Sequence, residues 1–480
     1  MKPEEELQQL RAENQALREQ LAQRDEQLVQ LLQRVQALEE RLAKDSHNSS
    51  LPPSSDRFGR QKKSRSLRKS SGKKTGGQTG HAGRTLEMSK TPDEVIALPK
   101  VSQCQHCQAD LREIAAQSME RRQVVDVPLP RLQVTEYLGE RKQCPHCQGY
   151  TSTTFPSEVA APVQYGPRVG AIGTYLVMQQ LLPWSRSCEV LWDLVGVHLS
   201  EGTLASLIER TAQHLVPIEA QIKTALSAEK VIHQDETGLY VKNRRVWMHG
   251  TSTAHLTHYQ VHQSRGHEAL DEIGILATFN GVSVHDGWAP YFRYDCCHAL
   301  CLVHILRELT YLAEEFGLWW AAKLKKLLLS MKQATDEART QGKHGLSPPE
   351  VSTFTARFLA LLDEGDQVHL SVPTPKGKRG RAKQHPARNL LDRLRKHQQA
   401  VLLFLERLDV PFDNNQAERD IRMVKVQQKV SGSFRSTKGA VHFCRIRGYL
   451  STLRKQGLQI FSALEATLRG QPLLPSFLET

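Results

Sequence analysis

Three carboxylates of this 480-residue chain have the residue types and settings for metal-dependent chemistry. Asp235 and Asp286 each end a short apolar run that predicts a β-strand, and Glu418 lies on a polar helix predicted over residues 413–430. If the three converge at the rim of a sheet, they could hold two Mg²⁺ or Mn²⁺ ions and catalyse an in-line phosphoryl transfer. The alternative is that all three are ordinary surface caps.

The charged neighbours of these carboxylates are expected to differ in their roles. Glu236 would face the opposite side of a continuing strand, and Asp420 would lie on a different helix face from Glu418. Arg422 and Lys425 follow Glu418 by one and two helical turns, so they share its face. Basic side chains beside a metal-binding carboxylate suit the grip of a phosphate, which predicts that Arg422 and Lys425 contact DNA.

Four of the nine cysteines predict a structural zinc site. They form two C-x-x-C pairs, Cys104 with Cys107 and Cys144 with Cys147. Each pair can present two thiolates to one tetrahedral Zn²⁺, and two such knuckles joined by a hairpin make a zinc ribbon. Alternating apolar residues predict the strands of that hairpin at residues 124–127 and 131–138. The spacing between the pairs is longer than usual, and redox pairs or buried free thiols are the alternatives.

The net charge of +13 arises largely from one segment. Between Arg57 and Arg84 the chain has ten Lys or Arg residues and no acidic residue, among many Gly and Ser residues. Such a composition predicts a disordered basic arm that neutralises phosphates, although a solvated tether has the same composition. The residues of the arm expected to bind DNA are Arg57, Arg60, Lys62, Lys63, Arg65, Arg68, Lys69, Lys73 and Lys74.

A heptad repeat in residues 1–44 predicts a coiled coil. One seam of the repeat consists of Leu7, Asn14, Leu21, Leu28, Val35 and Leu42, and the other of Leu10, Leu17, Arg24, Leu31 and Leu38. A single polar seam residue such as Asn14 typically fixes the register of a parallel dimer, so a homo-oligomer is expected. A hetero-oligomeric coil and a lone amphipathic helix are the alternatives.

The order of the remaining elements predicts an α/β fold. Three adjacent strands, a helix and a further strand ending at Asp286 form the opening order of an RNase H-like core. Two helices joined at Gly196 resemble a DNA-binding helix-turn-helix, a pattern shared with plain helix hairpins. The expected domains are a coiled coil (1–44), a basic disordered linker (45–99), a zinc ribbon (100–155), a helix-turn-helix-like region (156–228), a first core part (229–296), a helical insertion (297–410) and a second core part with the tail (411–480).

Several motifs together resemble transposases of the insertion sequence 66 family. They are His-Gln-Asp235-Glu-Thr, Val-His-Asp286-Gly-Trp-Ala-Pro-Tyr, Asp-Asn-Asn415-Gln-Ala-Glu418-Arg-Asp-Ile-Arg422, the linker Asn48-Ser-Ser-Leu-Pro-Pro-Ser-Ser-Asp56, Gly76-Gly-Gln-Thr-Gly-His81 and the paired knuckles. The resemblance implies a DDE transposase with an RNase H-like core, in which Asp235, Asp286 and Glu418 are catalytic. One departure is Leu51, where the family usually has Lys.

The resemblance also covers a short helical motif after the second aspartate. Cys301-Leu-Val-His304-Ile-Leu-Arg307 matches the C-x-x-H-x-x-R helix of the family, which begins an insertion domain. The nearby Cys296 and Cys297 raise the possibility of a second metal site with Cys301 and His304. Packing of helices around buried thiols is the commoner outcome for such cysteines.

The resemblance implies binding of the terminal inverted repeats of an insertion sequence, followed by DNA cleavage and strand transfer. The partners would be DNA, a second copy of the chain and small accessory proteins of the same element, with Mg²⁺ or Mn²⁺ and Zn²⁺ as cofactors. No run of about 18 uncharged apolar residues and no signal-peptide pattern is present, so a cytoplasmic, nucleoid-associated protein is expected. The rival functions are a non-catalytic zinc-containing DNA-binding regulator and an RNase H-like nuclease without strand transfer.

Overall fold

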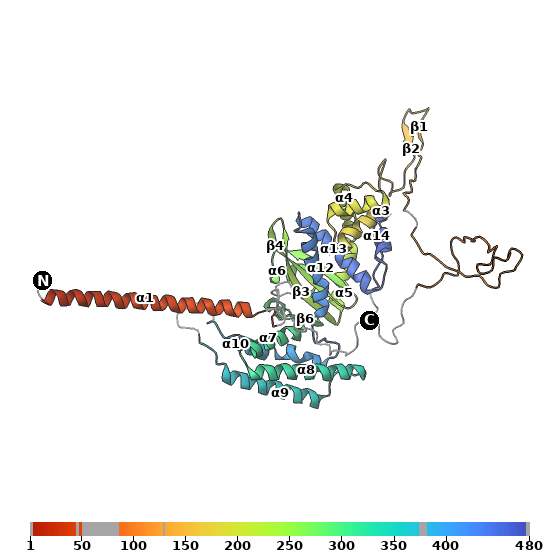
Figure 1. Ribbon diagram of the computed structural model, residues 1–480. Helices are drawn as coiled ribbons and strands as arrows, with labels where there is room; N and C mark the ends of the chain where they lie inside the picture. The colour runs from red at the N-terminus through yellow and green to blue at the C-terminus, as the bar shows by residue number, and fades with distance from the viewer. Residues whose placement is uncertain (1–2, 45–47, 50–85, 128–129, 374–381, 477–480) are drawn as a thin grey trace. The chain divides into compact units, whose positions relative to one another are not determined.

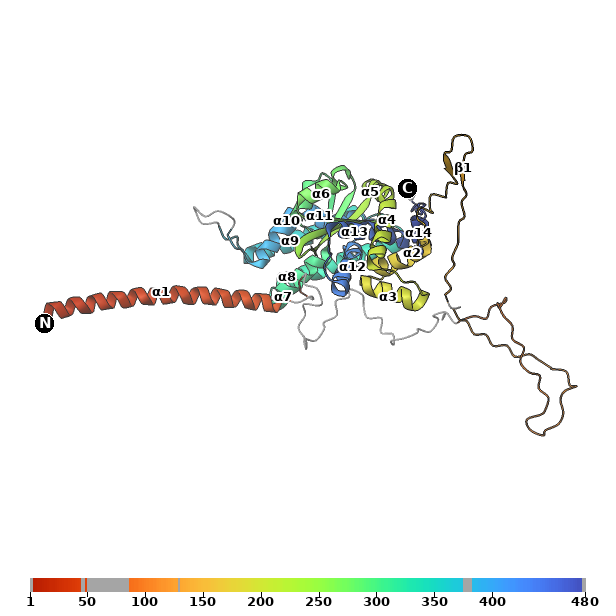
Figure 2. The ribbon, with the colours of Figure 1, turned by 90° about the horizontal axis from the view of Figure 1, so that it is seen from above.

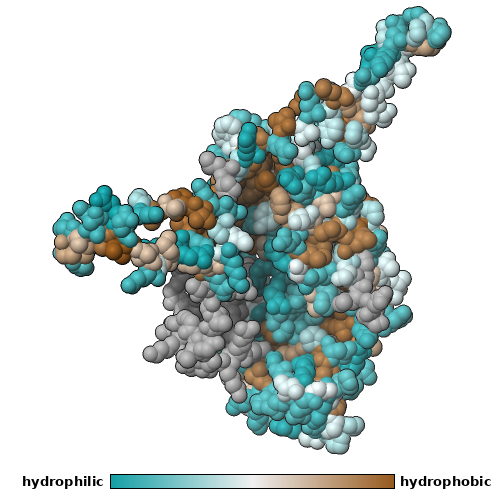
Figure 3. All heavy atoms as spheres, turned by 90° about the vertical axis from the view of Figure 1, so that its right-hand side faces the viewer, coloured by the Kyte–Doolittle hydropathy of each residue, from teal (hydrophilic) through white to brown (hydrophobic). Residues whose placement is uncertain are grey.

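The computed structural model describes residues 3–44, 48–49, 86–127, 130–373 and 382–476. The chain forms two compact units, one of residues 65–133 and the other of residues 1–64 with 134–480. In the part of the chain that the structure describes, no helix has the length and apolar character needed to cross a membrane. On the face drawn in Figure 3, hydrophobic residues form separate patches with hydrophilic residues between them.

The N-terminal segment is one continuous helix, α1 (Pro3–Ala43), as Figure 1 shows. The heptad leucines whose side chains the structure describes are exposed: Leu21 and Leu28 keep 61% and 59% of their surface, and Leu31 keeps 65%. Covering such a stripe with a partner helix would stabilise it, and no other described part of the chain buries these leucines.

A five-stranded mixed sheet lies at the centre of the larger unit (Figures 1 and 2). Its strands, in spatial order, are β5 (Thr257–His262), β4 (Arg244–Ser252), β3 (Val231–Val241), β6 (Val282–His285) and β7 (Cys297–Leu300). β3, β4 and β5 form an antiparallel meander, whereas β6 and β7 run parallel to β3. The tight turn between β3 and β4 has Lys242 and Asn243 at positive φ, as a two-residue hairpin of type I′ requires.

Helices from both ends of the unit pack on this sheet around a shared apolar core. They are α2 (Pro167–Thr174) with the π-helical turn η2 (Tyr175–Gln179), α3 (Trp184–Val195), α4 (Glu201–His214), α5 (Val216–Ala228), α6 (His267–Ile273), α12 (Asn415–Ser431), α13 (Thr437–Lys455) and α14 (Ile460–Leu468), with short 3-10 turns η3 (Leu276–Thr278) and η4 (Ala289–Arg293). α12 contacts β3 and β4, and α13 contacts β5. Segments more than 150 residues apart in sequence therefore build one core.

The predicted helix-turn-helix segment is a pair of helices with well-defined ends. Gly196 ends α3 in the left-handed region at φ 71°, which glycine adopts without strain. Ser200 then begins α4, because its Oγ accepts the Thr203 N–H at 3.0 Å. Both ends lie where the sequence predicts them.

A second group of helices has an apolar core of its own, which continues into the sheet through Val282 and Leu300. The group consists of α7 (Leu302–Glu315), α8 (Trp319–Thr340), α9 (Pro348–Val368), α10 (Pro386–Lys396) and α11 (Gln398–Glu406). α9 begins with a capping box in which Ser347 and Glu350 satisfy each other's backbone N–H groups. The prediction of helices from residue 297 onward is wrong at its start, because residues 297–300 form β7.

Two strand predictions also differ from the structure. The runs ending at Asp235 and Val241 are a single strand, so Asp235 lies within β3 rather than at its end. The strands predicted at residues 124–127 and 131–138 are not formed, and the side chains of Val124 and Val134 are 93% and 91% exposed. Alternation stabilises a strand only when a partner strand and an apolar layer are available. The short strands around the second cysteine pair are β1 (Arg141–Gln143) and β2 (Tyr150–Ser152).

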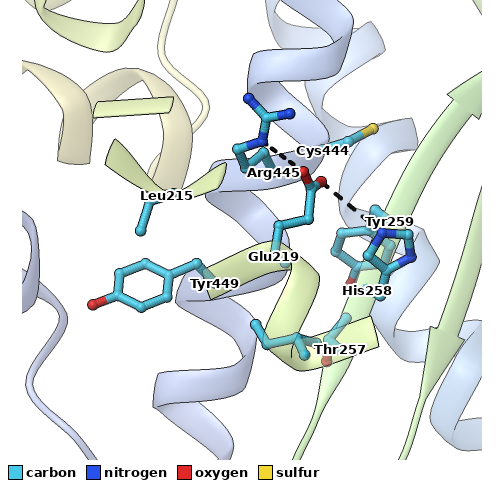
Figure 4. A pocket seen from close by; sticks show the side chains of 10 residues that line it. Leu215, Glu219, Thr257, His258, Tyr259, Cys444, Arg445 and Tyr449 are labelled. Atoms are coloured by element: carbon cyan, nitrogen blue, oxygen red, sulfur yellow. Dashed lines mark hydrogen bonds and ion pairs between the residues drawn. The ribbon is translucent and has the colours of Figure 1, made fainter. Parts of the chain in front are cut away.

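A partly buried polar cluster joins α5, α13 and β5 (Figure 4). Arg445 Nε donates to Glu219 Oε2 at 2.6 Å, and His258 Nε2 lies 3.9 Å from Glu219 Oε1. Burial and the positive charges of Lys223 and Arg445 lower the pKa of His258 to about 3. His258 is therefore neutral in the folded protein at pH 7, and Arg445 supplies the counter-charge for Glu219.

We expect acid to destabilise the fold through His258 and His249, because burial also lowers the pKa of His249 to about 4. Both histidines bind a proton more readily when unfolded, so stability falls as the pH drops from about 6.5 toward 4. In this pH window, each of the two histidines should lower the free energy of unfolding by about 1.4 kcal/mol for every pH unit. Urea unfolding of His258→Gln should show a shallower pH dependence than the wild type. The exposed His344 provides the control, since His344→Gln should leave the pH dependence unchanged; equal slopes for all three proteins would contradict the assignment.

Candidate active site

The parallel pairing of β3 with β6 places the two aspartates at the same level of the sheet. Val231 pairs with Val282 and His233 pairs with Val284. Continuing this register by two residues brings Asp235 level with Asp286, which directly follows β6. Asp286 is held by the Trp288 N–H, which donates to Oδ1 at 2.9 Å. The aspartates therefore meet at one position of the sheet, although only Asp286 is at a strand end.

Asn414 fixes the helix that carries the glutamate. This residue precedes α12, is 2% exposed, and donates from Nδ2 to the Gln234 carbonyl oxygen at 2.7 Å. Its Oδ1 lies 2.8 Å from Nδ1 of His233. Because Gln234 and His233 directly precede Asp235 on β3, these two bonds attach the first turn of α12 beside that aspartate. Glu418 lies in this first turn.

The electrostatics of Asp235 show that the carboxyl groups interact. Burial raises the pKa of Asp235 well above its ordinary value, and the negative charges of Glu236, Asp286 and Glu418 raise it further. The charges of Asp286 and Glu418 therefore both act on Asp235. Like charges in a poorly solvated site repel each other, and a bound divalent cation would relieve that repulsion. Carboxylate oxygens are also the ligands that suit Mg²⁺ and Mn²⁺, so these residues fit such an ion.

Glu418 differs from the aspartates because basic groups surround it. Burial acts to raise its pKa, but a hydrogen bond from His304 and the charges of Arg307 and Arg422 give a pKa below the ordinary value. His304 Nε2 lies 3.0 Å from Glu418 Oε1. The predicted C-x-x-H-x-x-R motif is therefore part of the site: it begins at the N-terminal end of α7 and faces Glu418.

Cys301, the first residue of that motif, is buried with 1% of its surface exposed. The backbone N–H of Asn414 donates to its Sγ at 3.2 Å, and its own N–H donates to the His285 carbonyl oxygen at 2.8 Å. Cys301 thereby connects the end of β7, the start of α7 and the segment before α12.

Glu236 and Asp420 each have basic or hydroxyl partners of their own. Glu236 accepts a hydrogen bond from Arg265 Nε at 2.9 Å and one from the Tyr291 hydroxyl at 2.6 Å. Asp420 pairs with Lys455 at 2.8 Å. Asp420 thus pairs with a residue of α13, whereas the charge of Glu236 still acts on Asp235 and Asp286.

Sequence reasoning missed three residues that shape the site: Asn414, Arg265 and Tyr291. Arg265 lies over the ring of Trp288, 4.3 Å from its centroid, and over that of Trp247 at 4.8 Å. A lone Arg or Tyr far from the aspartates in sequence gives no local signal. The Asn-Asn pair before Glu418 does give a local signal, because Asn commonly precedes the first turn of a helix. That signal predicts a helix cap, but it does not predict the hydrogen bond that Asn414 makes to β3.

Of the predicted DNA-binding residues, the nine basic ones from Arg57 to Lys74 lie outside the described residues. Arg422 is exposed on α12 and its charge reaches Glu418. Lys425 is exposed as well, and its Nζ donates to the carbonyl oxygen of Gly238. Arg422 is therefore the better placed of the two to meet an incoming phosphate.

The two cysteine pairs form matching turns, one in each unit. The Gln108 N–H donates to the Cys104 carbonyl oxygen at 3.0 Å, and the Gln148 N–H donates to the Cys144 carbonyl oxygen at 2.9 Å. Both glutamines have positive φ, 63° and 58°. Backbone N–H groups of Cys107 and His106 lower the pKa of Cys104, and those of Cys147 and His146 do the same for Cys144. Donors aimed at a thiolate suit a zinc ligand, so each pair separately fits two ligands of a Zn²⁺ ion.

Comparison with known proteins decides the family. Residues 162–442, more than half of the chain, match the family model described as Transposase IS66 family. The chain belongs to this family.

The matched range of this IS66 family member contains all three carboxylates and the Cys301 motif, but not the cysteine pairs. Residues 2–87 match a second model, described as Family of unknown function (DUF6444). The uncharacterized protein y4jO of Sinorhizobium fredii is 34% identical to this chain over 88 residues, which is 18% of this chain and 27% of that protein. The chain thus matches only about a quarter of that relative's length.

Proposed function

We propose that this IS66 family member is a DDE transposase in which Asp235, Asp286 and Glu418 are the catalytic carboxylates. The observation that carries the proposal is that the β3–β6 register sets Asp286 level with Asp235, while the bond from Asn414 to Gln234 attaches the start of the Glu418 helix beside them. The antiparallel meander followed by two strands parallel to β3 supports an RNase H-like core. Glu418, on a helix beside the sheet, completes the set.

The carboxylates would hold Mg²⁺ or Mn²⁺, which supplies charge neutralisation at the attacking and leaving oxygens of a phosphodiester. The other residues bind and orient. Asn414 keeps Glu418 beside β3, and Asp286 is oriented by the Trp288 backbone. The guanidinium groups of Arg422 and Arg307, whose charges already reach Glu418, attract the DNA phosphate to the carboxylates.

The N-terminal parts would bind and pair the DNA ends of the element. The exposed heptad leucines of α1 support a coiled-coil homodimer. The zinc ribbon predicted from the sequence would follow the basic arm, and each cysteine turn by itself fits two of its ligands. Two ends held by one dimer raise the effective concentration of each end for the other. The protein would act on DNA of the nucleoid in the cytoplasm, with small accessory proteins of the element as further partners.

The function is tested with purified protein and DNA that carries the ends of the element. We expect Mg²⁺-dependent cleavage at the ends, and joining of precut ends with a 3′-hydroxyl to a second DNA. A DNA-binding regulator would bind the ends and leave the DNA intact in Mg²⁺. A nuclease would cleave and fail to join precut ends, so the two reactions separate all three functions.

A further inference from the structure

A thiol, an imidazole and a carboxylate meet beside the catalytic carboxylates. The ligand atoms of Cys301, His304 and Glu418 all lie within 4.8 Å of one another. Cys296 and Cys297, which the sequence suggested as partners of Cys301 and His304, are not part of this group. The second metal site considered from the sequence therefore has a different composition, with Glu418 in place of those cysteines.

This donor set does not match the ion expected at the aspartates. Mg²⁺ prefers oxygen ligands alone, whereas sulfur and imidazole nitrogen together with a carboxylate suit Zn²⁺. In a tetrahedral Zn²⁺ site the Zn–S distance is about 2.3 Å and the Zn–N and Zn–O distances are about 2.0–2.2 Å. With these bond lengths, neighbouring ligand atoms lie about 3.5 Å apart, which is somewhat closer than the limit of 4.8 Å found for the three atoms here. Small side-chain rotations would therefore bring the three atoms to binding distances.

The backbone around these residues is held by contacts from three elements. Cys301 and His304 lie three residues apart at the start of α7, and Glu418 is fixed across from them by Asn414. The Asn414 N–H that points at the Cys301 sulfur would stabilise a thiolate. The side chains of His304 and Glu418 are 21% and 25% exposed, so solvent reaches two of the three ligands.

We propose that Cys301, His304 and Glu418 form a binding site for Zn²⁺, and that a Zn²⁺ ion held there withdraws Glu418 from Asp235 and Asp286. Binding of the ion releases the thiol proton of Cys301 to solvent and leaves a thiolate ligand. Because a Zn²⁺ ion held by Cys301 and His304 would turn the Glu418 carboxylate toward itself and away from the aspartates, its binding inhibits Mg²⁺-dependent cleavage. The inhibition rests on the proposed function, whereas the binding itself does not.

The binding is tested on the full-length protein without DNA. Metal-free wild type and variants are dialysed against Zn²⁺, or against Co²⁺ as a coloured substitute, and the bound metal per chain is measured. Loss of a second-sphere partner typically weakens metal binding 10- to 100-fold, so removal of a direct ligand should weaken it by about 100-fold or more. We expect Cys301→Ser to bind one ion fewer than the wild type and to lose the corresponding sulfur-to-cobalt absorption.

Two further variants keep this test decisive. His304→Gln removes a partly exposed ligand and should show the same loss even if Cys301→Ser folds poorly. Cys297→Ser removes a nearby exposed thiol outside the group and should retain the wild-type metal content. Any ion held by the cysteine pairs at Cys104 and Cys144 is present in all of these proteins, so it does not contribute to the difference in metal content between them. Equal metal content and absorption in folded wild type and both ligand variants would overturn the proposal.

The inhibition is tested by adding Zn²⁺ to the Mg²⁺-dependent cleavage reaction, with each protein compared with its own rate in Mg²⁺ alone. Half-inhibition of Cys301→Ser should require about 100-fold more Zn²⁺ than that of the wild type. Equal sensitivity would overturn the withdrawal of Glu418. If the wild type binds the extra ion but shows no cleavage in Mg²⁺, the proposed function fails and the Zn²⁺ site stands.

Discussion

Asp235→Asn is expected to reduce Mg²⁺-dependent cleavage of the element ends by about 1,000-fold or more, which corresponds to about 4 kcal/mol of lost transition-state stabilisation. The amide keeps the size of the side chain and removes the charge that would hold the metal ion. Binding of the ends should be unchanged, because the basic arm and the helical regions do not depend on Asp235. Gel-shift and cleavage assays on the same DNA measure both quantities.

Asp295→Asn is the matched control, since Asp295 is an exposed aspartate a few residues past Asp286. This variant should cleave at the wild-type rate. Cleavage by Asp235→Asn within tenfold of the wild type would show that the carboxylate assignment is wrong. Equal loss in both variants would point to a general effect of removing negative charge from this surface.

Asn414→Ala should unfold more easily and lose most of its cleavage activity, although residue 414 carries no reactive group. The substitution removes the bonds to the Gln234 carbonyl oxygen and to His233, and it leaves the buried carbonyl without that donor. Each buried group left unpaired costs about 1–3 kcal/mol, so the free energy of unfolding should fall by about 2–4 kcal/mol. Urea unfolding measures this loss.

The effect on cleavage should exceed the loss of folded protein, because α12 is no longer fixed beside β3. We expect a drop of about 100-fold in the cleavage rate per folded molecule, as small displacements of positioning groups can cost that much. Asn415→Ala removes the same side chain from the next position, where it is exposed, and should leave stability and rate unchanged. A normal rate in folded Asn414→Ala would show that Glu418 needs no such attachment.

The elements around the aspartates were predictable because their signals are local. Strand alternation before Asp286, the glycine at 196 and the serine at 200 each act over a few residues, and the structure has the helix ends where those signals put them. The resemblance of the motifs to the IS66 family supplied the pairing of Asp235 with Glu418, which no local pattern contains. The family match of residues 162–442 confirms that resemblance.

The predictions that failed depended on partners that a single segment does not contain. Val124 and Val134 alternate with polar residues, yet both are exposed and no strand forms. Asp235 was expected to end a short strand, but pairing with β4 extends β3 to Val241. The bond from Asn414 to Gln234 joins residues 180 positions apart, and only the folded chain brings them together. The zinc ribbon and the coiled coil stay predictions.

The helical group from α7 to α11 has a consequence for the order in which the site is made. Asp235 and Asp286 leave the ribosome first, and about 130 residues are then synthesised before Glu418 follows. At a typical rate of ~10 residues per second, the growing chain carries two of the three carboxylates for roughly ten seconds without the third. Under the proposed function, a nascent or prematurely ended chain would lack the complete set of carboxylates, so cleavage of the genome would be confined to chains that extend past Glu418.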